Sequence, residues 1–400
     1  MSKERPGLPK PLAGLRVLEF AQIAAGPFTG CLLADLGADV VKIERPDGGD
    51  GMRGWPPLHR GENHADPFSG NFTSVNRNKR SIALDIKNES DLERLYALIE
   101  NADVFIENFR PGVLIRAGLG YEQVKSRNRR LVYCSITGYG QTGPYAQKGA
   151  FDVTVQAMSG MMSVTGEPDG PPVKCGVPVG DFATGLYAAF VILAAVMRAR
   201  QTGQGAHIDC SILGSLLGIA ALQTSEYFGT GVPPSRLGSA HPRNAPYAGF
   251  DSADRPFTIA AGNDKLWRDT CAIVGRPDLP NDPRFITQSL RARNQGELAA
   301  VLQPIFSSRT AAEWIAEFDA KGIPCAPINN FAEILADPHI REMGWVQPIT
   351  MPNGATTKTV GFPIGISDFA FEITHTPPQL GAHSEEVFDE WTQRRSAQVP

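Results

Sequence analysis

The chain has 400 residues, a formal net charge of −4, 42% hydrophobic residues and 20% charged residues. This length allows two or three domains with a large buried core. The slightly acidic balance argues against nucleic acid or an anionic membrane surface as a partner. The amino terminus lacks the apolar core of a signal peptide, and the longest apolar stretch, residues 183–197, is too short to span a bilayer. We therefore expect a cytoplasmic protein.

The cysteines and histidines show no metal-binding or disulfide pattern. The six cysteines form no CxxC pair, and the seven histidines form no HxxxH or HExxH motif. Reduced, mostly buried thiols fit this spacing best. We expect neither a metal site nor a tightly bound cofactor.

The first half of the chain alternates apolar strands with helices. This order predicts an α/β fold whose large domain is a doubly wound, Rossmann-like parallel sheet. We expect residues 46–75 to form a long loop and residues 136–181 to be irregular, with a short helix near 151–160. The strands are predicted at 15–20, 38–44, 102–107 and 130–136, and the helices at 26–36 and 90–101.

A long apolar helix begins near Asp181 and stops at the cation- and glycine-bearing segment 198–205. A strand at 206–210 and a helix at 211–228 follow. The Gly- and Pro-rich segment 229–234 then predicts a domain boundary.

We therefore divide the chain into a large domain (1–228), a small α/β domain (229–330) and a carboxyl-terminal segment (331–400) that returns to the large domain. In the small domain we expect a strand at 256–261 and helices near 264–275, 293–306 and 311–321, and in the last segment a helix at 383–394.

The turn after the first strand does not fit a nicotinamide site. Residues 24–30 depart from GxGxxG, and Pro27 and Phe28 crowd the place of a pyrophosphate, although Glu44 ends the second strand as a ribose-binding acid would. Several cations follow apparent strand ends instead, where α/β proteins bind ligands, and this suits a phosphate-bearing ligand. They are Arg45, Lys79, Arg80, Lys87, Arg110, Arg116 and Lys148.

Asp181 is the strongest candidate for chemistry. A carboxylate at the start of an apolar helix is shielded from water, while the helix dipole favours its ionised form. Such a group can act as a nucleophile. Asp is also a favoured helix N-cap, so a purely structural role remains open.

Several segments spread along the chain match the pattern of a known family. They are 15–20, 33–44, 78–85, 102–112, 165–172 and Gly180–Asp181. Through them the chain resembles the class III CoA-transferases from about residue 12 to about residue 388. The resemblance implies that Asp181 attacks the donor thioester, forming an aspartyl anhydride and then an aspartyl-CoA thioester. It also implies an interlocked homodimer of ring-shaped chains, with CoA as a substrate.

The resemblance also implies a set of CoA-binding residues. It places Ala25 beside the pantetheine and Arg45 and Lys148 near phosphates. The other matching positions are Ala24, Leu84, Lys87, Asn108, Phe109 and Arg116.

Departures from the family pattern narrow the expected activity. The formyl-CoA enzymes carry a glutamine at the position of Ala24, and the racemases carry a histidine where this chain has Phe151. The stretch around His241 and Arg243 is similar to the succinyl-CoA:glutarate branch, and both side chains could hold a dicarboxylate's far carboxylate. We expect transfer of CoA from succinyl-CoA to a dicarboxylate. Racemisation of 2-methylacyl-CoA and non-catalytic binding of acyl-CoA remain as alternatives.

Overall fold

The computed structural model describes residues 9–61 and 66–392. The chain divides into two compact units. The first comprises residues 1–161, 175–225 and 339–400, and the second comprises residues 162–174 and 226–338. Residues 162–174, which we had assigned to the large domain, join the second unit because Gly238 N–H bonds to Gly166 O at 2.9 Å and Arg236 Nε bonds to Glu167 O at 3.3 Å.

A six-stranded sheet forms the centre of the first unit, and all of its strands pair in parallel. This confirms the α/β class and the parallel sheet. The strand order reverses between β1 and β6, and ligands of such sheets bind beyond the carboxyl ends of the strands at this point. In spatial order the strands are β5 (Lys79–Ala83), β2 (Asp39–Glu44), β1 (Arg16–Phe20), β6 (Val104–Glu107), β7 (Val132–Thr137) and β8 (Ala206–Ser211).

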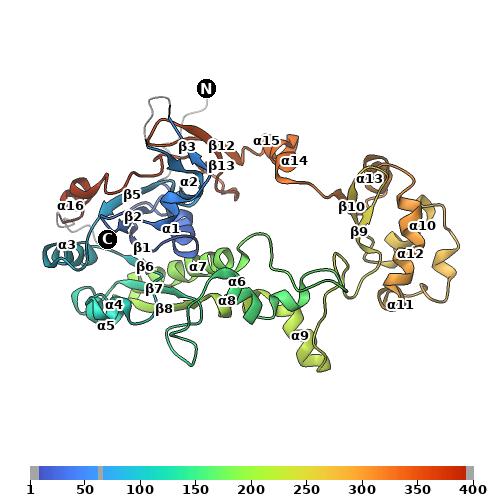
Figure 1. The fold of residues 1–400 in the computed structure, drawn as a ribbon, viewed down its shortest axis with the longest axis horizontal. Helices are drawn as coiled ribbons and strands as arrows, with labels where there is room; N and C mark the ends of the chain where they lie inside the picture. Colours follow the sequence, from blue (N-terminus) through green and yellow to red (C-terminus); the bar gives the residue numbers. More distant parts are fainter. Residues whose placement is uncertain (1–8, 62–65, 393–400) are drawn as a thin grey trace. The chain divides into compact units, whose positions relative to one another are not determined.

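Helices cover both faces of this sheet (Figure 1). Val17, Val40 and Val104 face α1 (Ala25–Asp35) and α7 (Val179–Thr202), and the alternate residues Leu18 and Phe105 face the opposite layer. This alternation follows from the two-residue period of a strand. The opposite layer contains α3 (Glu89–Ile99), α4 (Val113–Arg116), α5 (Tyr121–Arg127) and α16 (Ser384–Thr392).

Some segments of the first unit differ from the expectation. The long loop expected at 46–75 is, in its described residues 46–61 and 66–75, more ordered than a loop, because Asp50 caps a 3-10 turn and Ser69 caps a helix. The helix expected at 211–228 is two helices. The remaining elements of the first unit are η1 (Gly51–Gly54), β3 (Leu58–His59), β4 (Phe68–Ser69), α2 (Gly70–Asn76), α6 (Asp152–Met158), α8 (Ile212–Ile219) and the hairpin of β12 (Val346–Thr350) and β13 (Thr356–Val360). Three further elements lie where the chain passes from one unit to the other: η2 (Met161–Val164), α9 (Ala221–Thr230) and α15 (Pro338–Glu342).

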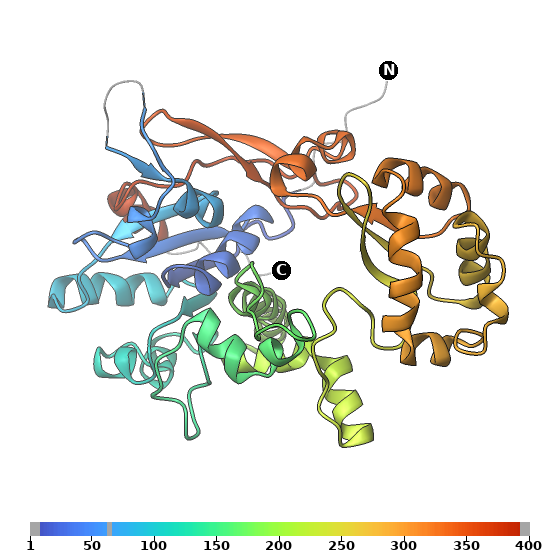
Figure 2. The same ribbon diagram turned by 45° about the vertical axis from the view of Figure 1, so that its right-hand side comes forward.

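The second unit has its own core around an antiparallel sheet of order β11-β10-β9. Its helices, yellow to orange in Figure 2, pack Trp267, Phe306 and Trp314 against Phe257 of the sheet. The helix expected at 293–306 begins earlier and is split at Asn294. The elements are β9 (Tyr247–Asp251), β10 (Pro256–Ala260), α10 (Asp264–Ile273), η3 (Leu279–Asn281), α11 (Gln288–Arg293), α12 (Gln295–Phe306), α13 (Ala311–Ala320), β11 (Cys325–Pro327) and α14 (Phe331–Ala336).

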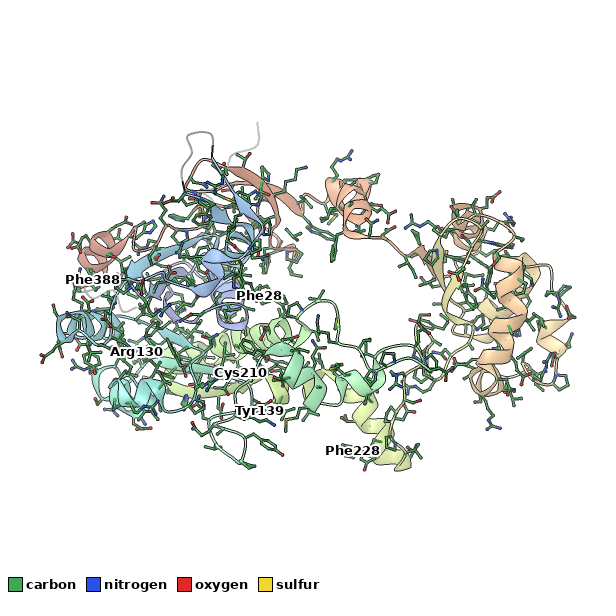
Figure 3. The ribbon with its side chains drawn as sticks, in the orientation of Figure 1. Phe28, Arg130, Tyr139, Cys210, Phe228 and Phe388 are labelled. Carbon is green, nitrogen blue, oxygen red and sulfur yellow. The ribbon has the colours of Figure 1, made fainter. Side chains whose placement is uncertain are left out.

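Helix α7 is longer than its most apolar stretch suggested. Its 24 residues are long and apolar enough to cross a bilayer by length and composition, so the expectation of insufficient length does not hold. Ala188 and Ile192 are nevertheless fully buried against the sheet, as expected for a core helix. Near its start, Phe182 meets Phe28 of α1 edge to face, with 4.8 Å between ring centroids (Figure 3 labels Phe28).

Candidate active site

A cleft of about 340 Å³ lies beyond the carboxyl ends of β1, β6 and β7, within the first unit. The loop after β1 supplies Gln22 to Ala25, and the loop after β6 supplies Asn108 to Arg110. Residues 136–138, the segment 150–152 and Asp181 complete the wall. The cleft therefore occupies the position at which the strand order reverses, where the parallel sheet predicts a ligand.

Asp181 is the third residue of α7, inside the first turn, and Pro178 occupies the N-cap position. The N-cap interpretation of Asp181 is therefore wrong. Asp152 does the capping instead: its Oδ1 accepts hydrogen bonds from Gly180 N at 2.8 Å and from Asp181 N at 3.3 Å. Glycine at position 180 permits this close contact, because a Cβ there would lie 2.8 Å from the same Asp152 oxygen.

Burial raises the pKa of Asp181 to about 6, and the nearby Asp152 carboxylate adds to the rise. The helix amino terminus favours the ionised form, but it does not offset the lost hydration. Asp181 is consequently ionised above pH 6 while poorly solvated. A carboxylate in that condition is more reactive than one in water.

The partner of Asp181 is itself firmly held. Gln156 Nε2 donates to Asp152 Oδ2 at 2.6 Å, and Gln156 Oε1 accepts from Cys175 N at 2.9 Å. Gln156 is fully buried. Through Gln156 and Asp152, helix α6 links Cys175, which precedes α7, to the amides of the first turn of α7.

The loop after β1 forms another part of the cleft wall and is held by hydrogen bonds to Asn108. Gln22 N donates to Asn108 Oδ1 at 2.9 Å, and Asn108 Nδ2 donates to Gln22 O at 2.8 Å. The next residue, Phe109, packs edge to face on Phe20 with 4.8 Å between centroids. Asn108 and Phe109 thus shape the cleft by their contacts within the protein.

The structure brings together Asp181 with four of the residues predicted to bind CoA. Ala24, Ala25, Asn108 and Phe109 all line the cleft. Small side chains at 24 and 25 leave room for a thin ligand such as a pantetheine arm.

The other five predicted contacts lie away from this lining. Leu84 is 1% exposed within the core, so only its backbone can meet a ligand. Lys148 places its ammonium 5.3 Å from the Tyr145 ring centroid. Arg45, Lys87, Arg116 and Lys148 are exposed, and their contact with CoA remains a prediction.

Lys79, Arg80 and Glu44, which the sequence suggested as ligand contacts, form ion pairs within the fold instead. Lys79 is fully buried and pairs with Glu19 at 2.7 Å, and Arg80 pairs with Asp39 at 2.7 Å. Glu44, considered as a ribose-binding acid, pairs with Arg53 at 2.6 Å. These residues stabilise the sheet edge and are not available to phosphate or ribose.

His241 and Arg243 lie in the second unit and make local contacts. His241 Nδ1 accepts from Arg243 N at 3.1 Å, and its ring stacks on Tyr247 with 4.9 Å between centroids. Partial burial and the Arg243 charge lower the pKa of His241. Arg243 pairs with Glu226 at 3.1 Å, between exposed side chains. Their role in acceptor binding remains a prediction.

Sequence reasoning did not identify Gln22, Ile23, Thr137 or Ile212 as part of the cleft. The available signal was the position of Gln22 and Ile23 directly after the first strand. Gln22 is therefore an amide-bearing residue of the cleft wall, whereas Ala24 has no side-chain amide.

Five of the thiols are structural. Cys31, Cys134, Cys210, Cys271 and Cys325 are free, and burial raises the pKa of each, that of Cys31 to about 12 and that of Cys210 to about 11. Cys210 lies on β8 (labelled in Figure 3). Thiols held in the protonated form are poor nucleophiles, and no cysteine is among the described residues that line the cleft with Asp181.

Comparisons with known proteins agree with the resemblance seen in the sequence. A family model described as CoA-transferase family III matches residues 12–384. A succinate–glutarate CoA-transferase of Agrobacterium fabrum is 38% identical over 97% of this chain and 97% of its own length. A succinyl-CoA:glutarate CoA-transferase of Homo sapiens is 36% identical over 95% of this chain and 86% of its own. The crystal structure of a CaiB/BaiF family protein from Brucella suis matches with a TM-score of 0.85 and 39% identity, covering 96% of this chain and 100% of that one.

Proposed function

The chain belongs to CoA-transferase family III and is an enzyme of the transferase class, and on this premise we propose that it moves CoA from succinyl-CoA to a dicarboxylate such as glutarate, with Asp181 as the nucleophile. The supporting observation is one carboxylate, partly stripped of water, in a cleft lined by Ala24 and Ala25. The named substrates of the similar enzymes support succinyl-CoA and glutarate.

The proposed reaction proceeds through covalent intermediates on Asp181. The ionised carboxylate attacks the thioester carbonyl, the C–S bond breaks, and an aspartyl–succinyl anhydride and the CoA thiolate result. The thiolate then attacks the aspartyl carbonyl and expels succinate, leaving an aspartyl-CoA thioester. The acceptor carboxylate repeats these steps in reverse, so that acyl-CoA leaves and Asp181 is regenerated.

Each carbonyl attack develops an oxyanion that needs hydrogen-bond donors. The amides of Gly180 and Asp181 already donate to Asp152. Gln22 lines the cleft, and its side-chain amide is the donor that we assign to the oxyanion. This amide replaces the one absent at Ala24.

We assign the remaining predicted residues to the ends of the substrates. Arg45, Lys87, Arg116 and Lys148 are exposed cations suited to CoA phosphates. Leu84 would contribute its backbone. His241 and Arg243 would hold the acceptor's far carboxylate.

No observation favours the racemase alternative. No histidine is among the described residues that line the cleft, and Phe151 is 73% exposed at its mouth. Removal and return of an α-proton on opposite faces of the substrate need two acid/base groups.

A homodimer in the cytoplasm, interlocked as the resemblance implies, completes the proposal. Helix α7 presents Leu186 (56% exposed), Phe190 (71%) and Met197 (65%) on the face turned away from its own sheet. Continuous exposed apolar surface of this kind marks an interface. A second copy of the chain is the partner that this face would take.

Replacing Asp181 with asparagine tests the nucleophile. Asp181→Asn should abolish succinyl-CoA:glutarate exchange while the dissociation constant of CoA, measured by calorimetry, changes less than about threefold, because the amide is isosteric but cannot attack. Hydroxylamine trapping after incubation with succinyl-CoA should label Asp181 in the wild type only. Sustained turnover by the variant would refute the mechanism.

The dimer has a separate test. After unfolding in urea and refolding, which interlocked chains need in order to separate, Phe190→Asp should give more monomer than the wild type in analytical ultracentrifugation, since it places a charge in an apolar contact. Gln201→Asp, at an exposed polar position of the same helix, is the matched control and should leave the mass unchanged. An unaltered dimer in Phe190→Asp would exclude this face.

A further inference from the structure

The loop after β1, which lines the same cleft as Asp181, contains a strained residue. Ile23 has a φ of +69°. Among the described residues, the only other non-glycine residues with positive φ are Asn78 and Asp368. Asn and Asp tolerate this region, whereas a β-branched side chain strongly disfavours it. The surrounding structure must therefore hold Ile23 in place.

Asp50 holds the strained backbone directly. Ile23 N donates to both carboxylate oxygens of Asp50, at 3.1 and 3.2 Å. Asp50 Oδ1 also accepts from Met52 N at 2.9 Å, and the residue is only 1% exposed. A buried carboxylate is consequently aimed at a single backbone amide of the cleft wall.

Lys42 fixes Asp50 from beneath. Its Nζ lies 2.9 Å from Asp50 Oδ2 and 3.0 Å from Glu19 Oε1, and it donates to Ala21 O at 2.7 Å. Lys42 thus contacts the strand end before the loop and the acid that holds the loop.

The group is closed to solvent. Glu19 and Lys42 are 0% exposed, and Lys79 completes the charge balance by pairing with Glu19 at 2.7 Å. Burial opposes the charge of Lys42, but Glu19 and Asp50 outweigh it and keep its pKa above the ordinary value. None of these four side chains lines the cleft.

We propose that Lys42 and Asp50 are positioning residues, which hold Ile23 in its left-handed conformation and so place Gln22 and Ala24 in the cleft wall with Asp181. Asn108 fixes Gln22 from the other side, with bonds of 2.9 and 2.8 Å. A loop fixed on both sides of its strained residue keeps its geometry without spending binding energy of the substrate. The inference rests on the proposed function of the cleft.

A double-mutant cycle separates positioning from general stability. Asp50→Asn should lower kcat by about 10- to 100-fold, the usual cost of displacing a reacting geometry by about an ångström. Glycine adopts positive φ without strain, so the same substitution made in an Ile23→Gly background should lower kcat less than about threefold relative to that background. Equal factors in the two backgrounds would overturn the proposal.

Asp35→Asn is the matched control. Asp35 is 2% exposed and pairs with Arg77 at 2.6 Å, away from the loop after β1. It should lower the melting temperature as Asp50→Asn does, while its effect on kcat stays the same in both Ile23 backgrounds. An Ile23-dependent effect of Asp35→Asn would assign the coupling to core stability and overturn the proposal.

Hydrogen exchange gives a readout that does not depend on catalysis. Asp50→Asn should speed exchange of a peptide spanning residues 22–25, since the Ile23 amide loses its charged acceptor, and Asp35→Asn should not. Unchanged exchange in Asp50→Asn would refute the positioning role. If Asp50→Asn alters the exchange but the wild-type enzyme is inactive towards succinyl-CoA and glutarate, the proposed substrates are wrong and the positioning role of Asp50 still holds.

Discussion

Asp152 and Asp181 meet at the first turn of α7, where Asp152 Oδ1 accepts from the Asp181 backbone N–H at 3.3 Å and from that of Gly180 at 2.8 Å. The Asp152 carboxylate accepts hydrogen bonds from the amides of the helix end, whereas the Asp181 side chain makes no hydrogen bond to any described residue. This division suits a reactive group, because hydrogen bonds to the helix amides would stabilise the Asp181 carboxylate and reduce its nucleophilicity.

The pH dependence of kcat should follow the ionisation of Asp181. Only the carboxylate attacks, and burial raises its pKa to about 6. We therefore expect kcat for exchange to rise about tenfold per pH unit below that pKa and to level off above it. Rates at saturating substrate between pH 4.5 and 8.5 measure this. A flat profile down to pH 4.5 would contradict the raised pKa.

Asp152→Asn should move that profile. The Asp152 charge contributes to the raised pKa of Asp181, so its removal should shift the acid limb down by about half a unit to one unit. The plateau should also fall by about tenfold, because a weaker acceptor holds the first turn of α7 less firmly.

Asp209→Asn is the control for this shift. Asp209 accepts from Gln141 N at 2.8 Å and does not line the cleft. Its acid limb should coincide with that of the wild type. A shift as large as that of Asp152→Asn would show that the effect arises from overall charge.

Gly180→Ala should impair catalysis although the change is a single methyl group. The added Cβ would lie 2.8 Å from Asp152 Oδ1 and 2.9 Å from Ile212, so the Asp152 side chain or the first turn of α7 must shift and the contact between them is disturbed. We expect kcat to fall by about 10- to 100-fold. Gly176→Ala is the control, since nothing lies within 4 Å of a Cβ at that position. Equal kcat values for the two variants would show that the Asp152 contact is unimportant.

The sequence predicted much of the sheet and little of the network around it. Strands β1 and β6 contain short apolar stretches, Val17–Leu18 and Val104–Ile106, which favour a buried sheet. Strand β5 was missed because it begins with Lys79 and Arg80, two cations that are buried only through their pairing with Glu19 and Asp39. Such pairs join distant segments and leave no local periodicity.

The candidate site shows the same limit. The position of Asp181 near a helix start could be read from the sequence, but its partner Asp152 belongs to another helix. Ile23 carries no sign of positive φ, since glycine or asparagine would be the usual residue there. The conformation follows from Asp50 and Lys42, whose convergence only the fold reveals.

Glu107, the last residue of β6, should make stability depend on pH. Burial raises its pKa to about 7, although Ser135 and the Phe109 N–H favour the ionised form. Its contribution to stability is fully present below the unfolded pKa near 4.5 and is lost as pH rises through about 7, since the folded state alone keeps the proton in that range. Glu107→Gln cannot ionise. Relative to the wild type, its free energy of unfolding should increase by about 2 kcal/mol between pH 5 and pH 8.

Urea midpoints of both proteins at these two pH values measure the difference.

Glu44→Gln provides a control of opposite sign. Burial opposes the charge of Glu44, but its hydrogen bonds with Arg53 and the nearby Lys42 prevail and lower its pKa. That contribution is present above the unfolded pKa and lost as pH falls, so Glu44→Gln should be less stable than the wild type at pH 8 and should approach it as the solution is acidified. A Glu107→Gln variant whose difference from the wild type stays constant with pH would show that Glu107 is ionised throughout this range. In that case the residue that precedes Asn108 and Phe109 carries a negative charge.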